Sequence, residues 1–317
     1  MARALLPSDR IADSVPPTLA VETEHVCKRF AGRAVVDSLS FAVHPGETFG
    51  LVGPNGSGKT TTIRMLLDII RPDSGRIAIL GAPLSDSVKD RIGYLPEERG
   101  LYRSVTTERT LRYLAALKGM PEREAVPRIE ELLRRTDLWR HRDKQVGELS
   151  RGMSQLIGFC AAIQHRPNLL ILDEPFSGLD PLNVKLMKEL IVDVGRSGTT
   201  IIFSTHQMED VEELCERVLM LDHGRRVLYG GLREIKARYR ANAVLIEYEG
   251  RLGPLRGVER TVERGFTAAE LLLAPGTDPQ DVLRQIAADG PRVSRFELAT
   301  PSLNEIFIRV AQAGGEA

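Results

Sequence analysis

The sequence of 317 residues predicts an α/β fold built around parallel strands. A glycine-rich segment, Gly53 to Thr60, follows a short apolar run and opens an amphipathic stretch. A second apolar run, Leu169 to Leu172, ends in two carboxylates, Asp173 and Glu174. A strand of this kind is typically buried, and it presents polar groups at the carboxyl edge of the sheet, where open α/β folds bind ligands.

The glycine-rich segment has the pattern G-x-x-x-x-G-K-[ST] of a phosphate-binding loop. Its glycines let backbone N–H groups approach phosphates, and the helix that starts near Lys59 adds free donors and a positive dipole end. We expect Lys59 to reach the β- and γ-phosphates of ATP and the Thr60 hydroxyl to bind Mg²⁺. A chance glycine-rich turn is the alternative until a second motif is found. The predicted nucleotide-binding residues here are Gly53, Pro54, Asn55, Gly56, Ser57, Gly58, Lys59, Thr60 and Thr61.

The two carboxylates after the second apolar run have separable expected roles. Asp173 would hold Mg²⁺, directly or through water, and Glu174 would orient and deprotonate the attacking water. Taken alone, the pair could be an ordinary strand end. Together with the upstream phosphate loop it indicates a nucleotide hydrolase.

Further motifs carry a family resemblance. Leu149 to Met153 reads LSRGM and resembles the ABC signature LSGGQ, and Ser177 to Asp180 resembles the D-loop. His206 ends the strand predicted over Thr199 to Ser204 and resembles the switch histidine. The order and spacing of five motifs make residues 19–235 resemble the ATPase subunit of an ABC transporter.

This resemblance implies a P-loop NTPase fold of ABC ATPase type, with a mixed sheet core, an antiparallel β subdomain and a helical subdomain over about residues 100–165. In the family, two ATPase domains pack head to tail around the nucleotides. Ser150 and Gly152 would therefore contact the γ-phosphate held by another chain, and Asp180 would link the two sites. His206 would sense that phosphate. The predicted partner is a second copy of this chain or a similar chain.

The segment from Ile92 to Tyr102 departs from the family at its Q-loop. Glu97 stands where the family usually has a glutamine that contacts Mg²⁺ and the attacking water. A carboxylate can still bind Mg²⁺, although it adds negative charge beside Asp173 and Glu174. The sequence of this segment resembles that of the ATPases of ABC-2 type exporters, including sodium-extrusion and drug-resistance systems.

The resemblance also implies an aromatic residue near the start of the domain that stacks on adenine, and Phe30 holds that position. A phenylalanine in such a segment is otherwise more often a core residue.

Composition limits the remaining function classes. Lys plus Arg and Asp plus Glu both number 43, and a net charge of zero argues against a nucleic-acid partner. Cys27, Cys160 and Cys215 have no metal or redox spacing and suggest a reducing compartment. No apolar run approaches the length of a membrane helix, so transport would require separate membrane subunits. The resemblance implies that these are permease subunits of ABC-2 type, which would hold a cytoplasmic protein on the inner face of the membrane. Residues 1–18 read as a flexible leader.

Residues 236–317 predict a small α+β accessory domain. Strands are expected at Ala243 to Tyr248, near Glu270 to Leu273 and near Val293 to Leu298, with a helix from Asp278 to Ala288 and a final helix beyond. Dimer support or regulation is the functional interpretation, and simple packing on the ATPase domain is the alternative.

The leading hypothesis is an Mg²⁺-dependent ATPase whose dimer closes on ATP and reopens after hydrolysis, driving export through membrane partners. One alternative is a soluble ABC-type ATPase that acts on nucleic acid or ribosomes. Another is a nucleotide-gated assembly module with little turnover, which the intact Glu174 argues against.

Overall fold

The computed structural model describes residues 18–97, 100–239, 242–265 and 267–314. The leader expected over residues 1–18 lies, except for Thr18, outside this part of the chain. Within it, no helix is both long enough and apolar enough to cross a membrane.

A six-stranded mixed sheet forms the centre of the main body, in the order β5-β6-β7-β3-β8-β9. The first five strands in that order are parallel, and β9 pairs antiparallel with β8 through the turn at His223 and Gly224. The strands are β3 (Thr48–Val52), β5 (Ile92–Leu95), β6 (Leu169–Asp173), β7 (Thr200–Thr205), β8 (Arg217–Asp222) and β9 (Arg225–Gly231).

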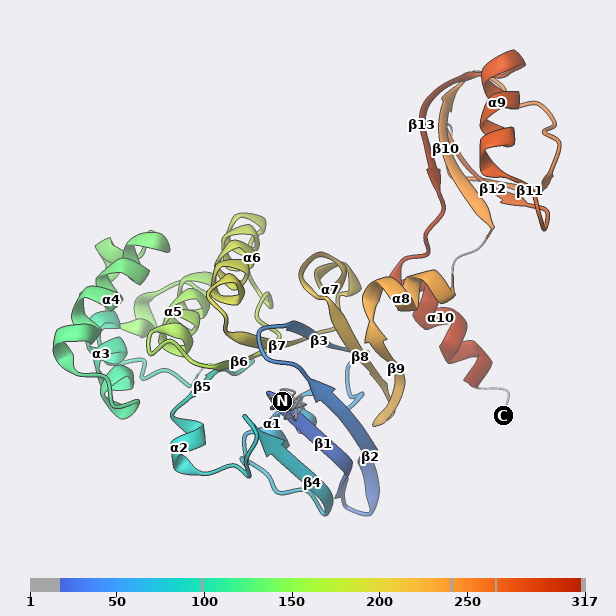
Figure 1. Ribbon diagram of the computed structural model, residues 1–317. Helices are drawn as coiled ribbons and strands as arrows, with labels where there is room; N and C mark the ends of the chain where they lie inside the picture. Colours follow the sequence, from blue (N-terminus) through green and yellow to red (C-terminus); the bar gives the residue numbers. More distant parts are fainter. Residues whose placement is uncertain (1–17, 98–99, 240–241, 266, 315–317) are drawn as a thin grey trace, which may run out of the picture.

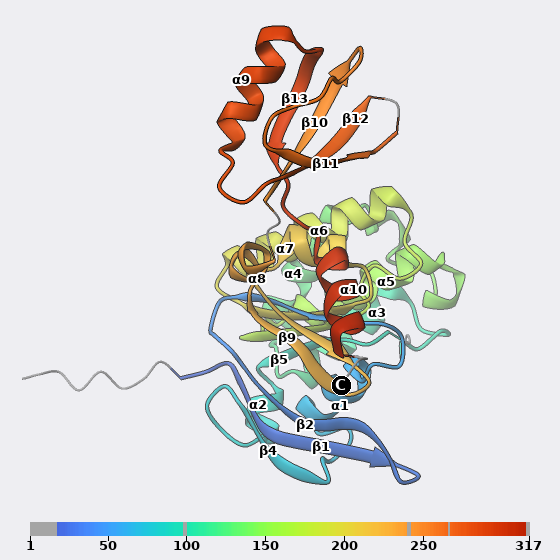
Figure 2. The same ribbon diagram turned by 90° about the vertical axis from the view of Figure 1, so that its right-hand side faces the viewer.

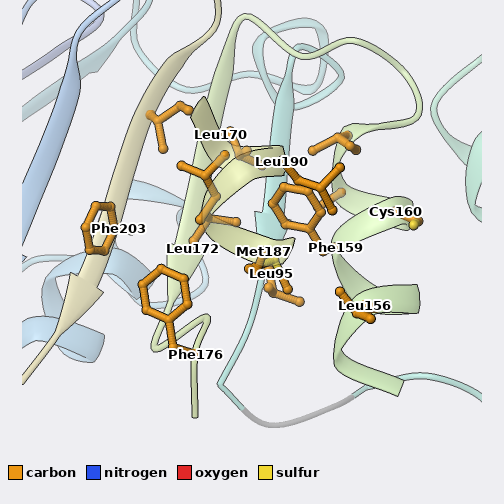
Figure 3. Packing of buried hydrophobic residues seen from close by; sticks show 14 of the residues in the cluster. Leu95, Leu156, Phe159, Cys160, Leu170, Leu172, Phe176, Met187, Leu190 and Phe203 are labelled. Atoms are coloured by element: carbon orange, nitrogen blue, oxygen red, sulfur yellow. The ribbon is translucent and has the colours of Figure 1, made fainter. Parts of the chain in front are cut away.

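Burial explains why the central strands read as continuous apolar runs. Every residue of β6 and β7 is buried, because helices cover the sheet on both faces. Side chains from β6 and from helices on one face interlock in the core, where Leu170 and Leu172 lie near Phe159 and Leu190 (Figure 3). The helices of this body are α1 (Lys59–Leu66), α2 (Asp86–Lys89), α5 (Arg151–Ile163), α6 (Pro181–Arg196) and α7 (Met208–Leu214).

An antiparallel layer lies beside the phosphate loop, as the resemblance implied (Figure 1). Its strand order is β2-β1-β4, and its apolar face joins Phe41 and Val43 to Phe49 and Ile63 of the main body. The strands are β1 (Val21–Phe30), β2 (Arg33–Val43) and β4 (Ser74–Ile79).

The helical subdomain consists of α3 (Thr107–Leu117) and α4 (Glu122–Arg135), packed against α5, with two short 3₁₀ helices at Trp139–His141 and Val146–Glu148. Leu111 and Ala115 on α3 and Ile129 and Leu132 on α4 are buried, and their spacing is that of one helix face.

A second unit stands apart from the main body in both views (Figures 1 and 2). Its sheet has the order β11-β12-β10-β13, and α9 covers one face through Val282 and Ile286. Its elements are β10 (Ala243–Glu249), β11 (Val258–Glu263), β12 (Ala268–Leu273), α9 (Pro279–Asp289) and β13 (Arg292–Leu298). The sequence did not predict β11, because its residues are mostly exposed and charged and show no apolar run.

Two helices of the C-terminal region pack on the main body rather than in this unit. They are α8 (Leu232–Arg238) and α10 (Leu303–Gly314). Ile235 of α8 and Leu303 and Ile306 of α10 belong to the core cluster of the main body. Glu212 of α7 holds both helices, because it pairs with Lys236 Nζ at 2.6 Å and accepts a hydrogen bond from the backbone N–H of Leu303. The domain bounds of 19–235 and 236–317 stay a prediction.

Candidate active site

The phosphate loop joins β3 to α1 at the carboxyl edge of the main sheet. Gly53, Gly56 and Gly58 have positive φ angles of 155°, 79° and 106°. A Cβ atom would lie 2.2 Å from the Leu221 carbonyl oxygen at Gly53 and 2.7 Å from the Val35 carbonyl oxygen at Gly58, whereas at Gly56 it would meet no atom within 4 Å. Packing of the chain on itself therefore requires glycine at two of these positions, a reason that the phosphate argument alone did not supply.

Lys59 is held inside this loop. Its Nζ donates hydrogen bonds to the carbonyl oxygens of Gly53 at 2.8 Å and Pro54 at 3.2 Å, and it lies 3.7 Å from Glu174 Oε1. Burial lowers the pKa of Lys59, and the carboxylates of Glu174, Asp173 and Glu97 act in the opposite direction. No side chain caps the N-terminus of α1, so its first N–H groups face the loop as donors.

Asp173 ends β6 with one carboxylate oxygen bonded and one free. Oδ1 accepts hydrogen bonds from Ser204 Oγ at 2.5 Å and Thr60 Oγ1 at 3.4 Å. Oδ2 is buried and has no hydrogen-bond partner in the described part of the chain. A buried, unpaired carboxylate oxygen beside a threonine hydroxyl fits Mg²⁺, which prefers hard oxygen ligands.

Glu174 follows in a conformation that is uncommon for its residue type, with φ at 48°. Its backbone N–H donates to the hydroxyl of Ser204 at 3.1 Å and to the carbonyl oxygen of the same residue at 3.2 Å. Its Oε2 lies 3.0 Å from His206 Nδ1. Burial raises the pKa of Glu174, while His206 and Lys59 act in the opposite direction. The β6–β7 pairing thus holds a carboxylate that is a stronger base than an exposed one.

A cavity of about 500 Å³ joins these groups. Besides the loop residues it is lined by Glu97, Glu174 and His206, so the structure brings the proposed base, the switch histidine and the unusual Q-loop residue together. Tyr94 lies behind the site on β5, where burial, followed by the charge of Asp173, raises its pKa to about 12. The complete lining is Val35, Asn55, Gly56, Gly58, Lys59, Thr60, Thr61, Glu97, Glu174, Ser177 and His206.

Ser150 and Gly152 of the signature and Asp180 of the D-loop lie next to one another and do not line this cavity, whereas Ser177 of the D-loop does. Ser150 is the N-cap of α5 and accepts from the Met153 N–H at 3.2 Å. Asp180 caps α6 and accepts from Asn183 Nδ2 at 2.5 Å. A Cβ at Gly152 would lie 3.4 Å from the same Asn183 nitrogen. This cluster therefore lies outside the nucleotide cavity of its own chain.

Two further residues that the sequence singled out have clear positions. Arg151, one departure from the family signature, lies over Gly178 of the D-loop, since a Cβ there would be 2.5 Å from Arg151 Nε. Phe30 ends β1, is 47% exposed, and has Lys28 Nζ 5.6 Å from its ring centre. It does not line the cavity, and its stacking role stays a prediction.

Sequence reasoning missed Ser204, which holds both Asp173 and the backbone of Glu174. The available signal was a polar residue at the end of an apolar strand, and only strand pairing shows that it faces Asp173. Gly224 was also missed as a support: its N–H donates to the Ser57 carbonyl oxygen at 3.0 Å, so the β8–β9 turn backs the phosphate loop.

The fold and this site define a P-loop ATPase with a signature loop. Comparison with known proteins gives the family: residues 36–177 match the ABC transporter family, and residues 230–311 match the C-terminal domain of ATP-binding proteins of the DrrA1-3-like type. The chain belongs to the ABC transporter ATP-binding proteins, and membership implies that it binds and hydrolyses ATP and works as a dimer with membrane permease subunits.

Relatives align over nearly the whole chain. The uncharacterized ABC transporter ATP-binding protein YhaQ of Bacillus subtilis is 42% identical, with 90% of this chain and 96% of that protein covered. The Nod factor export ATP-binding protein I of Rhizobium sp. (strain N33) is 35% identical, with 92% and 97% covered.

Solved structures agree with the fold. The structure of an ATP-binding subunit of an ABC transporter superposes with a TM-score of 0.66 at 33% identity and covers 70% of this chain and 93% of that one. The structure of cbiO1 from Clostridium perfringens, part of the transporter complex cbiONQ, superposes at 0.62 with 27% identity and covers 69% and 91%.

Proposed function

We propose that this chain is the Mg²⁺-dependent ATPase of an exporter, working as a dimer on separate ABC-2 type permease subunits at the cytoplasmic face of the membrane. The observation that carries the catalytic part is the position of Glu174. Its carboxylate lies between Lys59 and His206, in the cavity that the phosphate loop opens. The name of the Nod factor export relative supports export, and the match to the DrrA1-3-like C-terminal domain supports a permease of ABC-2 type.

Glu174 is the general base in this proposal. His206, with its proton on Nδ1, donates to Oε2 and fixes the carboxylate, so that the other oxygen can accept a proton from water attacking the γ-phosphate. Lys59 leaves its loop carbonyls to bind the β- and γ-phosphates and brings positive charge to the site of bond cleavage. Burial favours the step, because the raised pKa of Glu174 strengthens it as a base.

Thr60, Asp173 and Glu97 would hold the metal. When bound, Mg²⁺ neutralises phosphate charge during transfer of the γ-phosphoryl group. Ser204 donates to Asp173 Oδ1, which would leave Oδ2 available to bind the metal.

Dimerisation completes each site in this proposal. Ser150 and Gly152 lie at the start of α5, beside Asp180, and outside their own nucleotide cavity. Head-to-tail pairing places this cluster on the partner's γ-phosphate, and hydrolysis removes the group that joins the two chains.

The permease would dock beside the Q-loop. A mainly apolar cavity of about 280 Å³ lies between β5, α3 and α5, and Tyr94, Pro96, Leu101, Leu114 and Ala161 are among its lining residues. Tyr113 of α3 packs against Tyr102, which lies in the segment before that helix, and their ring centres are 6.1 Å apart. The two residues are 47% and 58% exposed. Aromatic residues favour protein interfaces, and Pro96 connects this surface to Glu97. Met120, which follows α3, packs partly buried against the core.

The test uses Glu174→Gln in the full chain. We expect kcat to fall by about 10²- to 10⁴-fold while ATP binding persists, because only the base is removed. Size-exclusion chromatography with light scattering should detect an ATP-dependent dimer of the variant, and chelation of Mg²⁺ should stop wild-type hydrolysis. Glu189→Gln, on the exposed face of α6, is the control. A Glu174→Gln variant with wild-type turnover would identify another residue as the base.

Purification from membranes tests the transport assignment. Recovery of a multi-helix permease with the chain supports it, whereas recovery with ribosomes or DNA would overturn it. The matching family and the relatives give no support to that nucleic-acid alternative.

A further inference from the structure

Helix α7 connects His206 to an ion-pair network that the proposed mechanism does not use. The helix begins at Met208, two residues after His206, and carries Asp210 and Glu213 on the side that faces α6. Lys188 of α6 reaches both carboxylates: its Nζ lies 2.7 Å from Asp210 Oδ1 and 2.5 Å from Glu213 Oε2. One lysine therefore joins the helix that follows the D-loop to the helix that follows the switch histidine.

Lys188 also contacts the segment that follows Glu174. Its Nζ lies 5.6 Å from the ring centre of Phe176, two residues after the proposed base. Phe176 in turn packs edge-on against Phe203 of β7, with ring centres 6.0 Å apart (Figure 3). Lys188 thus contacts both the segment that follows Glu174 and the helix that follows His206.

Burial makes this network stronger than an ordinary surface ion pair. The side chains of Lys188 and Asp210 are only 17% and 6% exposed. Asp210 Oδ2 is buried without a hydrogen-bond partner among the described residues, so Lys188 supplies the main compensation for this carboxylate. Removal of the lysine would leave a buried negative charge, which is relieved when α7 shifts toward solvent or when Asp210 takes up a proton, and in either case the tie between α6 and α7 at Asp210 is weakened.

We propose that Lys188 is a positioning residue for ATP hydrolysis, which holds α7 and thereby sets the His206 imidazole against Glu174. The inference rests on the proposed function, because it needs His206 and Glu174 to act together. Lys188 does not line the nucleotide cavity, so it acts on the orientation of the catalytic pair and leaves nucleotide binding alone. Small displacements of a catalytic group are enough to cost large factors in rate.

The test compares three variants of the full chain. Lys188→Met keeps the length and apolar stem and removes the charge; Lys188→Arg keeps the charge. Lys185→Met is the matched control, since Lys185 is exposed on the same helix, one turn earlier, and has no ion pair within the described ranges. We expect Lys188→Met to lower kcat about tenfold or more while the Kd of ATP changes less than about twofold. Lys188→Arg should recover most of the rate, and Lys185→Met should match the wild type.

A rate loss with an equal loss of ATP affinity, or a loss that the arginine does not recover, would overturn the inference, since either indicates general disruption. If Lys188→Met does not fold, Asp210→Ala gives a second test, because it removes the acceptor through which Lys188 holds the first turn of α7 and leaves Lys188 paired with Glu213 alone. We then expect the same split between kcat and Kd, and an unchanged kcat would contradict the proposal.

His206→Ala separates this inference from the function on which it rests. If His206→Ala stops hydrolysis and Lys188→Met leaves kcat unchanged, only the inference fails. If His206→Ala itself hydrolyses ATP at the wild-type rate, the role of His206 in the proposed function fails first.

Discussion

Helices pack on a sheet in both the main body and the C-terminal unit, but the two regions differ in the burial and pairing of their polar side chains. At the carboxyl edge of the main sheet, Asp173 Oδ2 and Ser57 Oγ are buried without partners in the described part of the chain, and Glu174 has an unfavourable φ. In the C-terminal unit, Arg264 pairs with Glu270 at 2.5 Å and Arg295 with Glu297 at 2.9 Å, and each pair has an arginine side chain that is at least half exposed. Unpaired buried groups cost free energy, so Asp173 Oδ2 and Ser57 Oγ beside the phosphate loop fit a site that a ligand completes, whereas pairs with an exposed partner are typical of a solvated surface.

Asp173→Asn gives the largest expected effect on this contrast. It keeps the side-chain size and replaces the free carboxylate oxygen, so the affinity for Mg²⁺ should fall by about a hundredfold or more, and turnover with it. Metal titration of ATPase activity measures the change. Asp222→Asn, at the end of the neighbouring strand β8, is the control and should titrate like the wild type. Equal behaviour of the two variants would remove Asp173 from the metal site.

Gly53→Ala tests the strain in the phosphate loop. The added methyl group would lie 2.2 Å from the Leu221 carbonyl oxygen, so the free energy of unfolding should fall by about 3 kcal/mol. Gly56→Ala meets no atom and has only the positive φ to oppose it, a cost of about 1 kcal/mol. Denaturant unfolding without nucleotide measures both values. Equal losses would mean that the Leu221 contact is not what requires glycine.

Protonation of His165 gives a test at a polar residue of the main body that does not line the nucleotide cavity. Burial, and then the charge of Lys118, lowers its pKa to about 4. Its Nε2 lies 3.2 Å from the Ile92 carbonyl oxygen, and its buried Nδ1 has no partner within the described chain. Since the unfolded chain takes up this proton near pH 6.5 and the folded chain only near pH 4, the free energy of unfolding falls as pH drops through that window.

His165→Gln should remove on the order of 2 kcal/mol of this loss, after allowance for partial exposure of the ring. Urea unfolding at a series of pH values measures it, with His223→Gln on the exposed β8–β9 turn as control. A variant whose stability followed the wild-type pH curve would show that His165 is protonated in the folded state.

Glu97→Gln restores the residue usual in the family. The concentration of Mg²⁺ for half-maximal hydrolysis should shift by about tenfold or less, and ATP affinity should change little, because Glu97 lies on the rim of the cavity. Parallel titrations of metal and ATP measure the two effects. An unchanged metal titration would exclude Glu97 from the metal site.

Glu270→Gln gives the smallest effect and completes the comparison. It breaks the pair with Arg264, whose side chain is 50% exposed, so the loss of stability should stay below about 1 kcal/mol. Hydrolysis by the full chain should be unchanged. A large loss of activity would mean that the C-terminal unit contributes to the catalytic site through this charge.

Much of the site was predictable because its signals are local. The phosphate loop, the strand that ends in Asp173 and Glu174, and the switch His206 each lie within a few residues of an apolar run that the sequence displays. Ser204 was not predictable, because its role depends on which strand lies beside β6. The packing of α10 was also hidden: the i, i+3, i+4 pattern of Leu303, Ile306 and Phe307 predicts a buried face and does not say which surface buries it.

By itself, then, the sequence determined the family, the motif residues and the alternation of strands and helices, since propensity and periodicity act over short distances along the chain. The tertiary structure alone decided that Lys188 joins α6 to α7, that Glu212 anchors the C-terminal helices, and that Gly53 must accommodate Leu221. Those contacts join residues far apart in sequence, and their energies depend on burial and distance, which only the folded chain defines.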